Sequence, residues 1–289
     1  MTGFRGIRDV VDAELKGQVR SYQWRKTPSA VTTAGIWFDL STAAGNPKAK
    51  NWFDAAPLVA AQVKQSTDGG IFHGANVSPQ QLHLRKSLSL TVVATPLPMQ
   101  MMLCDYLLYY PTIDDAELEP QVMDNTTTLP RYTDGQGVQM MAVTLAARTG
   151  GQSFYVTYTN QDGVTGRVSQ IVTQNTSSVI GTITTSFLTP NIGCTATPFI
   201  GLQEGDTGVQ AVESVTMLGA DTGLFAIVLV KPLVETLILN NVSPVEVDYL
   251  LHKVEMPRIY DDAFLGFLCL PNGSLAASAI IGNLKMIYN

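Results

Sequence analysis

Few side chains in this sequence are of types that could carry acid–base or metal chemistry. Its histidines are His73, His83 and His252, and the spacing of the first two fits no helical pair of zinc ligands, which stand closer together. His73 lies in a Gly-rich stretch, 70–74, where a histidine more often makes a structural hydrogen bond than acts as a base. We therefore expect neither a catalytic nor a metal-binding histidine.

The carboxylates offer one candidate for a cation site, the acidic run 114–119 between Pro111 and Pro120. A hard cation such as Ca²⁺ requires several oxygen ligands, but the central glycine of the calcium-binding loop is missing here. We interpret this run, and Asp261 with Asp262, as solvated turns, and leave cation binding by 114–119 open. No two carboxylates can be given a separation from sequence, so a glycosidase has no support.

Motifs of the common enzyme classes are missing as well. The sequence has no Gly-x-Gly-x-x-Gly, no Gly-Lys-Ser/Thr loop, no Gly-x-Ser-x-Gly and no Cys-x-x-Cys. The three cysteines, Cys104, Cys194 and Cys269, are widely spaced among apolar neighbours, which is typical of reduced core residues made in a cytoplasm. We predict that the protein is not an enzyme and binds no cofactor.

Composition limits the partners. The 289 residues are 45% hydrophobic and only 15% charged, with a formal net charge of −6 and a pI near 5.0, which argues against direct nucleic-acid binding. Residues 1–50 nevertheless contain eight Lys/Arg and four Asp/Glu. A basic arm on an acidic body suits docking onto an acidic protein lattice, unless the asymmetry is a chance fluctuation.

The sequence also gives no reason to expect a membrane protein. Its longest uninterrupted apolar run is 224–230, well short of the roughly 20 residues that a membrane helix needs. The N-terminus has no apolar core and no small-residue cleavage site, so we expect no secretory signal.

One segment, 7–20, has the periodicity of a helix. Its apolar stripe consists of Ile7, Val11, Leu15 and Val19, which recur every fourth residue. We expect this narrow stripe to pack on the protein's own body or on a neighbouring subunit. Residues 20–60, which hold every tryptophan of the chain, predict irregular loops and short edge strands with large buried anchors.

After about residue 84 the pattern becomes that of strands. They are predicted at 87–93, 154–159, 164–172, 179–187, 209–217, 223–230, 263–270 and 280–287. The nearly continuous apolar segment 99–110 is either a buried strand or a short helix, because periodicity does not separate the two.

The clearest hairpin joins 154–159 to 164–172 through Asp162 and Gly163, since glycine readily takes the positive φ of such turns. Each of its strands is expected to present one apolar face. These faces consist of Phe154, Val156 and Tyr158 on the first strand and Val164, Val168 and Val172 on the second.

Short strands separated by Gly and Pro predict a mainly β protein, an antiparallel β-sandwich or jelly-roll-like body with a short N-terminal helix and an extended arm. The length permits one large domain or two smaller ones. We divide the chain into 1–84, with the helix, arm and irregular loops for docking or oligomer contacts, and 85–289, the sandwich body.

Several segments together carry a family resemblance. They are 69–74 (GGIFHG), 97–111, 129–135 (LPRYTDG) and 267–274 (FLCLPNGS). With them the chain resembles virion structural proteins of tailed bacteriophages, and most closely a capsid decoration (cement) protein. The resemblance implies a non-enzymatic protein of the virion that is made in the host cytoplasm and binds the major capsid protein lattice. It also implies that the protein forms a homo-oligomer, most often a trimer.

Interface anchors are typically aromatic or Arg rather than Lys or Glu, and the N-terminal segment supplies such residues. The predicted interface consists of Arg5, Arg8, Arg20, Tyr22, Trp24, Arg25 and Trp37. Three alternatives stay open: a phage tail component (tube, baseplate or receptor-binding sandwich), a hydrolase of surface polysaccharide, and a β-sandwich of other role.

Overall fold

The computed structural model describes residues 3–184, 197–253 and 255–289. It confirms the predicted fold class, because the protein is mainly β, with antiparallel sheets in a sandwich-like arrangement and a short N-terminal helix. The expected extended arm after the helix is wrong, since that segment is a strand within a sheet.

The described residues form three sheets, to which we give names. The terminal sheet contains β1 (Val19–Lys26), β3 (Gly45–Asn46), β5 (Leu82–Thr91), β15 (Val245–Asp248), β16 (Arg258–Ile259) and β18 (Ile280–Tyr288). The central sheet contains β2 (Phe38–Asp39), β4 (Ala61–Gln62), β6 (Met99–Asp114), β8 (Gln139–Ala146), β12 (Ile183–Thr184), β14 (Leu224–Ile238) and β17 (Phe264–Leu270). The hairpin sheet contains β7 (Gln121–Val122), β9 (Ser153–Asn160), β10 (Arg167–Val168), β11 (Val172–Thr173) and β13 (Val209–Met217).

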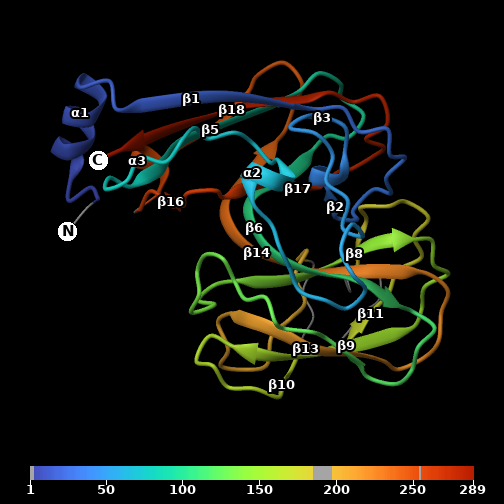
Figure 1. Cartoon of the computed structure of the whole chain (residues 1–289). Coiled ribbons are helices and arrows are strands. Elements are labelled where there is room, and N and C mark those ends of the chain that lie inside the picture. The colour runs from blue at the N-terminus through green and yellow to red at the C-terminus, as the bar shows by residue number, and fades with distance from the viewer. Residues whose placement is uncertain (1–2, 185–196, 254) are drawn as a thin grey trace.

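The long strands β6 and β14 of the central sheet connect two hydrophobic cores. Met101 and Leu103 of β6 lie in the core shared with the terminal sheet, whereas Tyr110 lies in the core shared with the hairpin sheet. Figure 1 shows this arrangement, with the terminal sheet at the top, the hairpin sheet at the bottom, and β6 and β14 crossing between them. The molecule is therefore two sandwiches that share one sheet.

A β-bulge in β6 keeps both cores on one face of the central sheet. Tyr106 pairs with Val230 and Leu108 with Leu229, so Leu107 is one residue too many on its strand. A bulge of this kind reverses the alternation of side chains, and even-numbered Tyr110 thereby faces the same side as odd-numbered Leu103.

An ion pair lies at the junction of these two cores. Asp105, on the same face as Leu103, is 1% exposed and accepts hydrogen bonds from Arg131 Nε at 2.9 Å and Nη2 at 2.7 Å. The same Nη2 also donates to the carbonyls of Val63 and Tyr106. A buried carboxylate requires a cation and hydrogen bonds to stay charged, and Arg131 supplies both.

The opposite face of the central sheet is covered by loops. Trp37 and Trp52 pack there against Tyr106, with the rings of Trp52 and Tyr106 stacked at 5.4 Å. The buried carboxylate of Asp39 accepts hydrogen bonds from Trp52 Nε1 and the Tyr106 hydroxyl, both at 2.7 Å. These polar tips are satisfied inside the core, as buried Trp and Tyr require.

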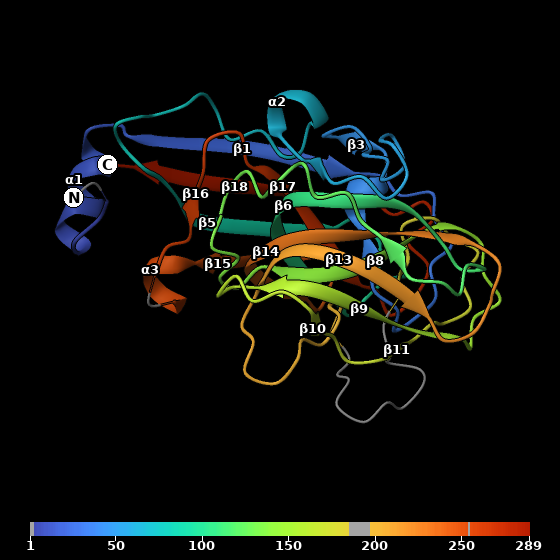
Figure 2. The same ribbon diagram turned by 60° about the horizontal axis from the view of Figure 1, so that its bottom comes forward.

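The helices of the described chain are short. They are α1 (Ile7–Leu15), α2 (Gln65–Asp68), α3 (Tyr249–His252) and the 3₁₀ helix Leu40–Thr42. Figures 1 and 2 both place α1 at one end of the molecule, beside the end of β18.

The predicted helix 7–20 is too long. The helix ends at Leu15 because Gly17 has φ 70°, a left-handed conformation that stops a helix. From Val19 the chain is strand β1, paired along its full length with β18. The predicted irregular loops therefore begin only after Lys26, and Figure 2 shows β1, β18 and β5 side by side.

Most predicted strands are present, and 99–110 is a strand, part of β6. The face Phe154, Val156, Tyr158 is fully buried as predicted. The apolar face of the return strand is wrong, because Val164 and Val168 are 50% and 44% exposed. That segment splits into the short strands β10 and β11.

The end of the predicted strand 179–187 and Cys194 lie outside the described residues. Cys104 and Cys269 are buried and free, as expected.

The predicted division at residue 84 follows no break in the structure. It falls inside β5, which pairs with β18, and β18 in turn pairs with β1 from the N-terminal segment. Residues from both sides of the division thus build one sheet and one core.

Replacing Arg131 by Met tests the junction. The change leaves the Asp105 carboxylate buried without its cation, and we expect a loss of about 3–5 kcal/mol in the free energy of unfolding, measured by chemical denaturation. The control is Glu14→Gln, which breaks the half-exposed pair with Lys285 and should cost at most about 1 kcal/mol. Equal losses in the two variants would contradict a special role for the junction.

Candidate protein interface

Helix α1 has apolar side chains on two sides, and only one side contacts the body. Val10 and Ala13 are 3% and 2% exposed and pack on Ile287 of β18. Three residues of the stripe that the sequence predicts to pack, Ile7, Val11 and Leu15, are exposed at 69%, 50% and 81%. Packing on the protein's own body is therefore wrong for these three, whereas the fourth residue, Val19, is partly buried against the same cluster as Val10. We name these three residues the α1 stripe.

The position of α1 is fixed on the sheet. Lys285 Nζ of β18 donates to both carboxylate oxygens of Glu14, at 2.8 and 3.0 Å. At the other end of the helix, the backbone N–H of Arg5 donates to the Asp9 carboxylate at 2.8 Å, and an acidic group in the first turn also complements the helix dipole. The α1 stripe is thus held outward by contacts on the opposite side of the helix.

Strand β5 of the terminal sheet has an inverted pattern in its second half. Leu82 and Leu84 are buried in the core, and a bulge follows them. Beyond it, Ser87, Ser89 and Thr91 are fully buried, whereas Leu88 and Leu90 lie partly buried on the outside. An antiparallel sheet with one solvated face normally buries the apolar residues and exposes the polar ones. Leu90 stands opposite Ile281 of β18, another partly buried apolar residue.

The small inward residues have a packing reason. Trp24 is buried against Gly282, where an added Cβ would come within 2.6 Å of the indole, and it packs on Phe267 at 4.5 Å between ring centroids. Gly282 pairs with Ser89. This explains why the inner residues are small, but not why leucines face out. We name the outward side chains Leu88, Leu90 and Ile281, with Gln23, Arg25 and Asn283 beside them, the outer face.

The structure separates the residues predicted to form the interface. Arg5, Arg8 and Arg25 are exposed. Arg20 and Tyr22 are half-buried and turned toward the loop after α2: Arg20 Nη1 donates to the carbonyls of His73 and Ala75, and Tyr22 packs edge-on against Phe72.

Trp24 and Trp37, each 2% exposed, are core residues. Their place in the predicted interface is wrong, because burying an indole in the protein's own core is more favourable than leaving it in water. The sequence analysis missed Leu88, Leu90 and Ile281, although their alternation with polar residues was visible. Alternation alone does not tell which set faces inward.

Strand β1 ends in a buried lysine. Lys26 is 5% exposed, and its ammonium donates to the carbonyls of Ala43 and Pro47 at 3.0 Å and of Ser41 and Lys48 at 3.4 Å. Burial lowers the pKa of Lys26 to about 8, against the opposing effect of the nearby Asp39 carboxylate. The lysine thereby fixes the end of β1 to the 41–48 segment.

Three of the residues considered for catalysis or cation binding make contacts within the fold. His73 is buried with Nε2 at 3.0 Å from the carbonyl of Ala263, and burial lowers the pKa of its imidazole; the structural role predicted for it is confirmed. From the acidic run 114–119, Asp115 is buried against Arg148. Asp262 caps the segment at Ser66. Within residues 3–184, 197–253 and 255–289, no group of three or more His, Cys, Asp or Glu is arranged to hold a metal ion.

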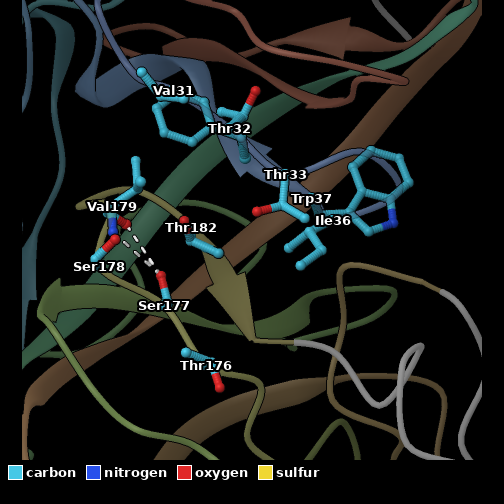
Figure 3. Close-up of a pocket in the computed structure, with 11 residues that line it drawn as sticks. Val31, Thr32, Thr33, Ile36, Trp37, Thr176, Ser177, Ser178, Val179 and Thr182 are labelled. Atoms are coloured by element: carbon cyan, nitrogen blue, oxygen red, sulfur yellow. Dashed lines mark hydrogen bonds between the residues drawn. The ribbon is translucent and has the colours of Figure 1, made fainter.

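Figure 3 shows a hollow of about 150 Å³ lined by threonine, serine and apolar side chains. It lies between the 31–38 segment and the 176–182 segment, and Ser177 and Val179 form hydrogen bonds with each other at its wall. Its described lining contains no ionisable side chain, so it offers hydroxyl groups for hydrogen bonds but no acid, base or charge.

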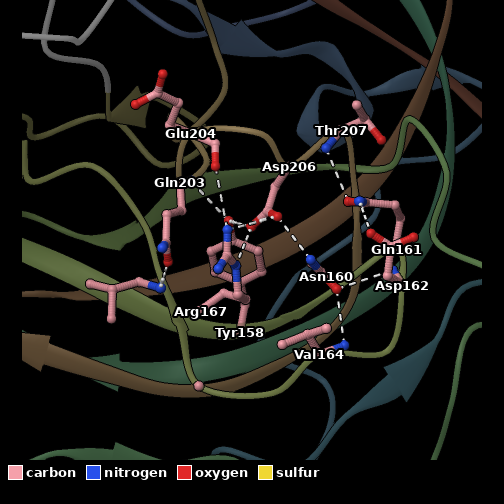
Figure 4. A network of polar contacts seen from close by, with 12 residues as sticks. Tyr158, Asn160, Gln161, Asp162, Val164, Arg167, Gln203, Glu204, Asp206 and Thr207 are labelled. Atoms are coloured by element: carbon pink, nitrogen blue, oxygen red, sulfur yellow. Dashed lines mark hydrogen bonds and ion pairs between the residues drawn. The ribbon is translucent and has the colours of Figure 1, made fainter.

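Figure 4 shows a polar network that joins the 203–207 segment to β9 and β10 of the hairpin sheet. The Asp206 carboxylate accepts hydrogen bonds from Arg167 Nε at 2.9 Å, Tyr158 hydroxyl at 2.6 Å and Asn160 Nδ2 at 2.8 Å. These hydrogen bonds, above all those from Arg167, lower the pKa of Asp206 to about 2. A carboxylate with this many donors stabilises the 203–207 segment against the hairpin rather than serving as a proton acceptor.

Comparisons of the chain with protein-family models, curated proteins and solved structures found no match. In the part of the chain that the structure describes, no helix is both long and apolar enough to cross a membrane. Of the surfaces and sites described above, the α1 stripe exposes its apolar side chains most, whereas the leucines of the outer face point outward but are partly buried.

Substitutions on the two sides of α1 test its orientation. Val10→Ser removes the apolar contact with Ile287, and we expect the α1 amides to exchange at least ten times faster because the helix opens locally. Val11→Ser, on the exposed side, should leave these rates within about threefold. Hydrogen exchange by NMR makes the comparison, and similar acceleration in both variants would show that the α1 stripe also packs on the body.

The pKa of Lys26 predicts a pH dependence of stability. Its folded pKa lies below the unfolded value of 10.5, so between pH 8 and 10.5 the unfolded chain binds more protons and stability rises with pH. From pH 7 to pH 9.5 the gain is about 2 kcal/mol relative to Lys26→Met, in which this group is missing. Chemical denaturation of both proteins at several pH values across this range measures the gain. If the free energies of unfolding of the two proteins change with pH in parallel, a buried, charged Lys26 is contradicted.

Proposed function

We propose that this protein is a non-enzymatic structural protein of a virion that binds and stabilises the capsid lattice of a tailed phage, as a decoration (cement) protein. The observation that carries the proposal is the exposed α1 stripe, together with the outward, partly buried leucines in the second half of β5 on the same side of the terminal sheet. We infer a decoration protein from a resemblance to virion structural proteins of tailed bacteriophages, which is carried by segments 69–74, 97–111, 129–135 and 267–274.

The physical basis is the cost of exposed apolar area. Burying a Val, Leu or Ile side chain contributes about 1.5–3 kcal/mol, so covering Ile7, Val11 and Leu15 alone supplies several kcal/mol for binding. A lattice presents the same partner surface many times, so a protein that stabilises it needs area and shape and requires no reactive group. The homo-oligomer expected for this family, a trimer, belongs to the same proposal.

Sedimentation with undecorated shells of the phage that encodes the protein tests the proposal. The double variant Val11→Glu/Leu15→Glu places two charges on the α1 stripe, and we expect its affinity for the shells to fall at least tenfold. The control, Val164→Glu/Val168→Glu, changes two exposed valines, one in the connection between β9 and β10 and one in β10, and should bind like the wild type. Unchanged binding of the first variant, or an equal loss in the control, would contradict the proposed interface.

Counting copies per particle by mass spectrometry separates the capsid from the tail. Hundreds of copies support decoration of the lattice. Six or twelve copies support the alternative role, a tail component such as a tube or baseplate protein.

A further inference from the structure

Strand β1 has one paired edge and one largely open edge. Its eight residues pair continuously with β18, from Val19 with Ile287 to Lys26 with Ile280. On the other side, the described pairing is limited to Arg25 and Lys26, which meet the two-residue strand β3. The edge from Val19 to Trp24 therefore has no strand beside it among the described residues.

The groups that point out of this edge follow from two hydrogen bonds. Gln18 accepts from the N–H of Tyr288 in β18, whereas the N–H of Thr27 donates to Ala44 on the β3 side. In an antiparallel strand, alternate residues direct their N–H and C=O to the same neighbour. The even-numbered residues thus bond to β18, and Val19, Ser21 and Gln23 present their backbone groups at the open edge.

This edge has only part of the usual protection of an edge strand. Natural edges are blunted by proline, bulges, charged side chains or a covering loop. The register of β1 with β18 is unbroken and 19–24 has no proline, while the 72–75 segment contacts the inward side chains of Arg20 and Tyr22. The charged residue Arg20 is turned to the carbonyls of His73 and Ala75 and stacks on Tyr288. The exposed side chains next to the open groups, Ser21 and Gln23, are uncharged.

The charges around the edge favour one kind of occupant. Arg8 and Arg25 are exposed and make no ion pair among the described residues. An extended acidic segment of another protein is attracted to them.

We infer that the open edge of β1 binds an extended, acidic segment of the partner protein by adding it as a further strand to the terminal sheet, as in β-augmentation. This inference rests on the proposed function, because it names the chemistry of the partner at the same end of the molecule. Backbone hydrogen bonds to Val19, Ser21 and Gln23 give the affinity, and the arginines select the charge.

The probe is a nine-residue capped peptide in which glutamate alternates with valine or threonine, compared with its lysine counterpart. We expect the acidic peptide to protect the amides of Val19, Ser21 and Gln23 from hydrogen exchange and to bind at least ten times more tightly than the basic one. Gln23→Pro removes one outward donor at a position where an edge strand tolerates proline, and it should weaken binding at least tenfold. Gln23→Thr keeps the N–H and should bind like the wild type.

Three results overturn the inference: equal binding of the two peptides, no binding of either, or concentration-dependent protection of the same amides without peptide, which would assign the edge to a second copy. If Gln23→Pro fails to fold, Ser21→Pro replaces it, and the wild-type exchange data stand without either variant. Shell sedimentation separates this inference from the proposed function. If the wild type and Gln23→Pro bind the shells equally well, the added strand alone is overturned. If the wild type does not bind the shells, the decoration role is overturned.

Discussion

The architecture depends on one constraint: a single sheet must support two others on the same face. The bulge at Leu107 keeps the alternation of β6 in phase with both cores, and the buried pair of Asp105 and Arg131 lies where the cores meet. Arg131 also donates to the carbonyl of Val63, which follows β4, and to that of Tyr106 in β6. It therefore connects its own segment to the central sheet at the point where the two cores meet. The terminal and hairpin sheets keep their relative positions through this shared support.

This support leaves the terminal sheet with one covered side. Its inner side packs on β6 and β17 through Trp24, Leu284 and their neighbours, while on its outer side α1 covers only the end near Ile287. Along the rest of that side, leucines of β5 face outward and serines face inward. Such an arrangement is unfavourable for a free surface and favourable for a covered one, which is why we place the contact with other proteins here.

The sequence predicted the class of fold and most strands, since alternation, turn residues and apolar runs are local signals. It did not predict that the α1 stripe points away from the body, because Val10 and Ala13 are also apolar and only the position of Ile287 decides between them. Nor did it predict the burial of Trp24 and Trp37 or the pairing of β1 with β18. That pairing joins the two ends of the chain, and no local pattern of residues 19–26 encodes it.

The central claim is that the protein acts by covering partners with α1, β1 and the outer face of the terminal sheet. Hydrogen–deuterium exchange of the particle-bound protein, compared with the free protein, tests it most directly. We predict slower exchange in peptides spanning 7–26 and 82–91 on the particle, with unchanged exchange in the hairpin 153–168. Protection confined to the hairpin sheet, or no difference between the bound and free protein, would contradict the account.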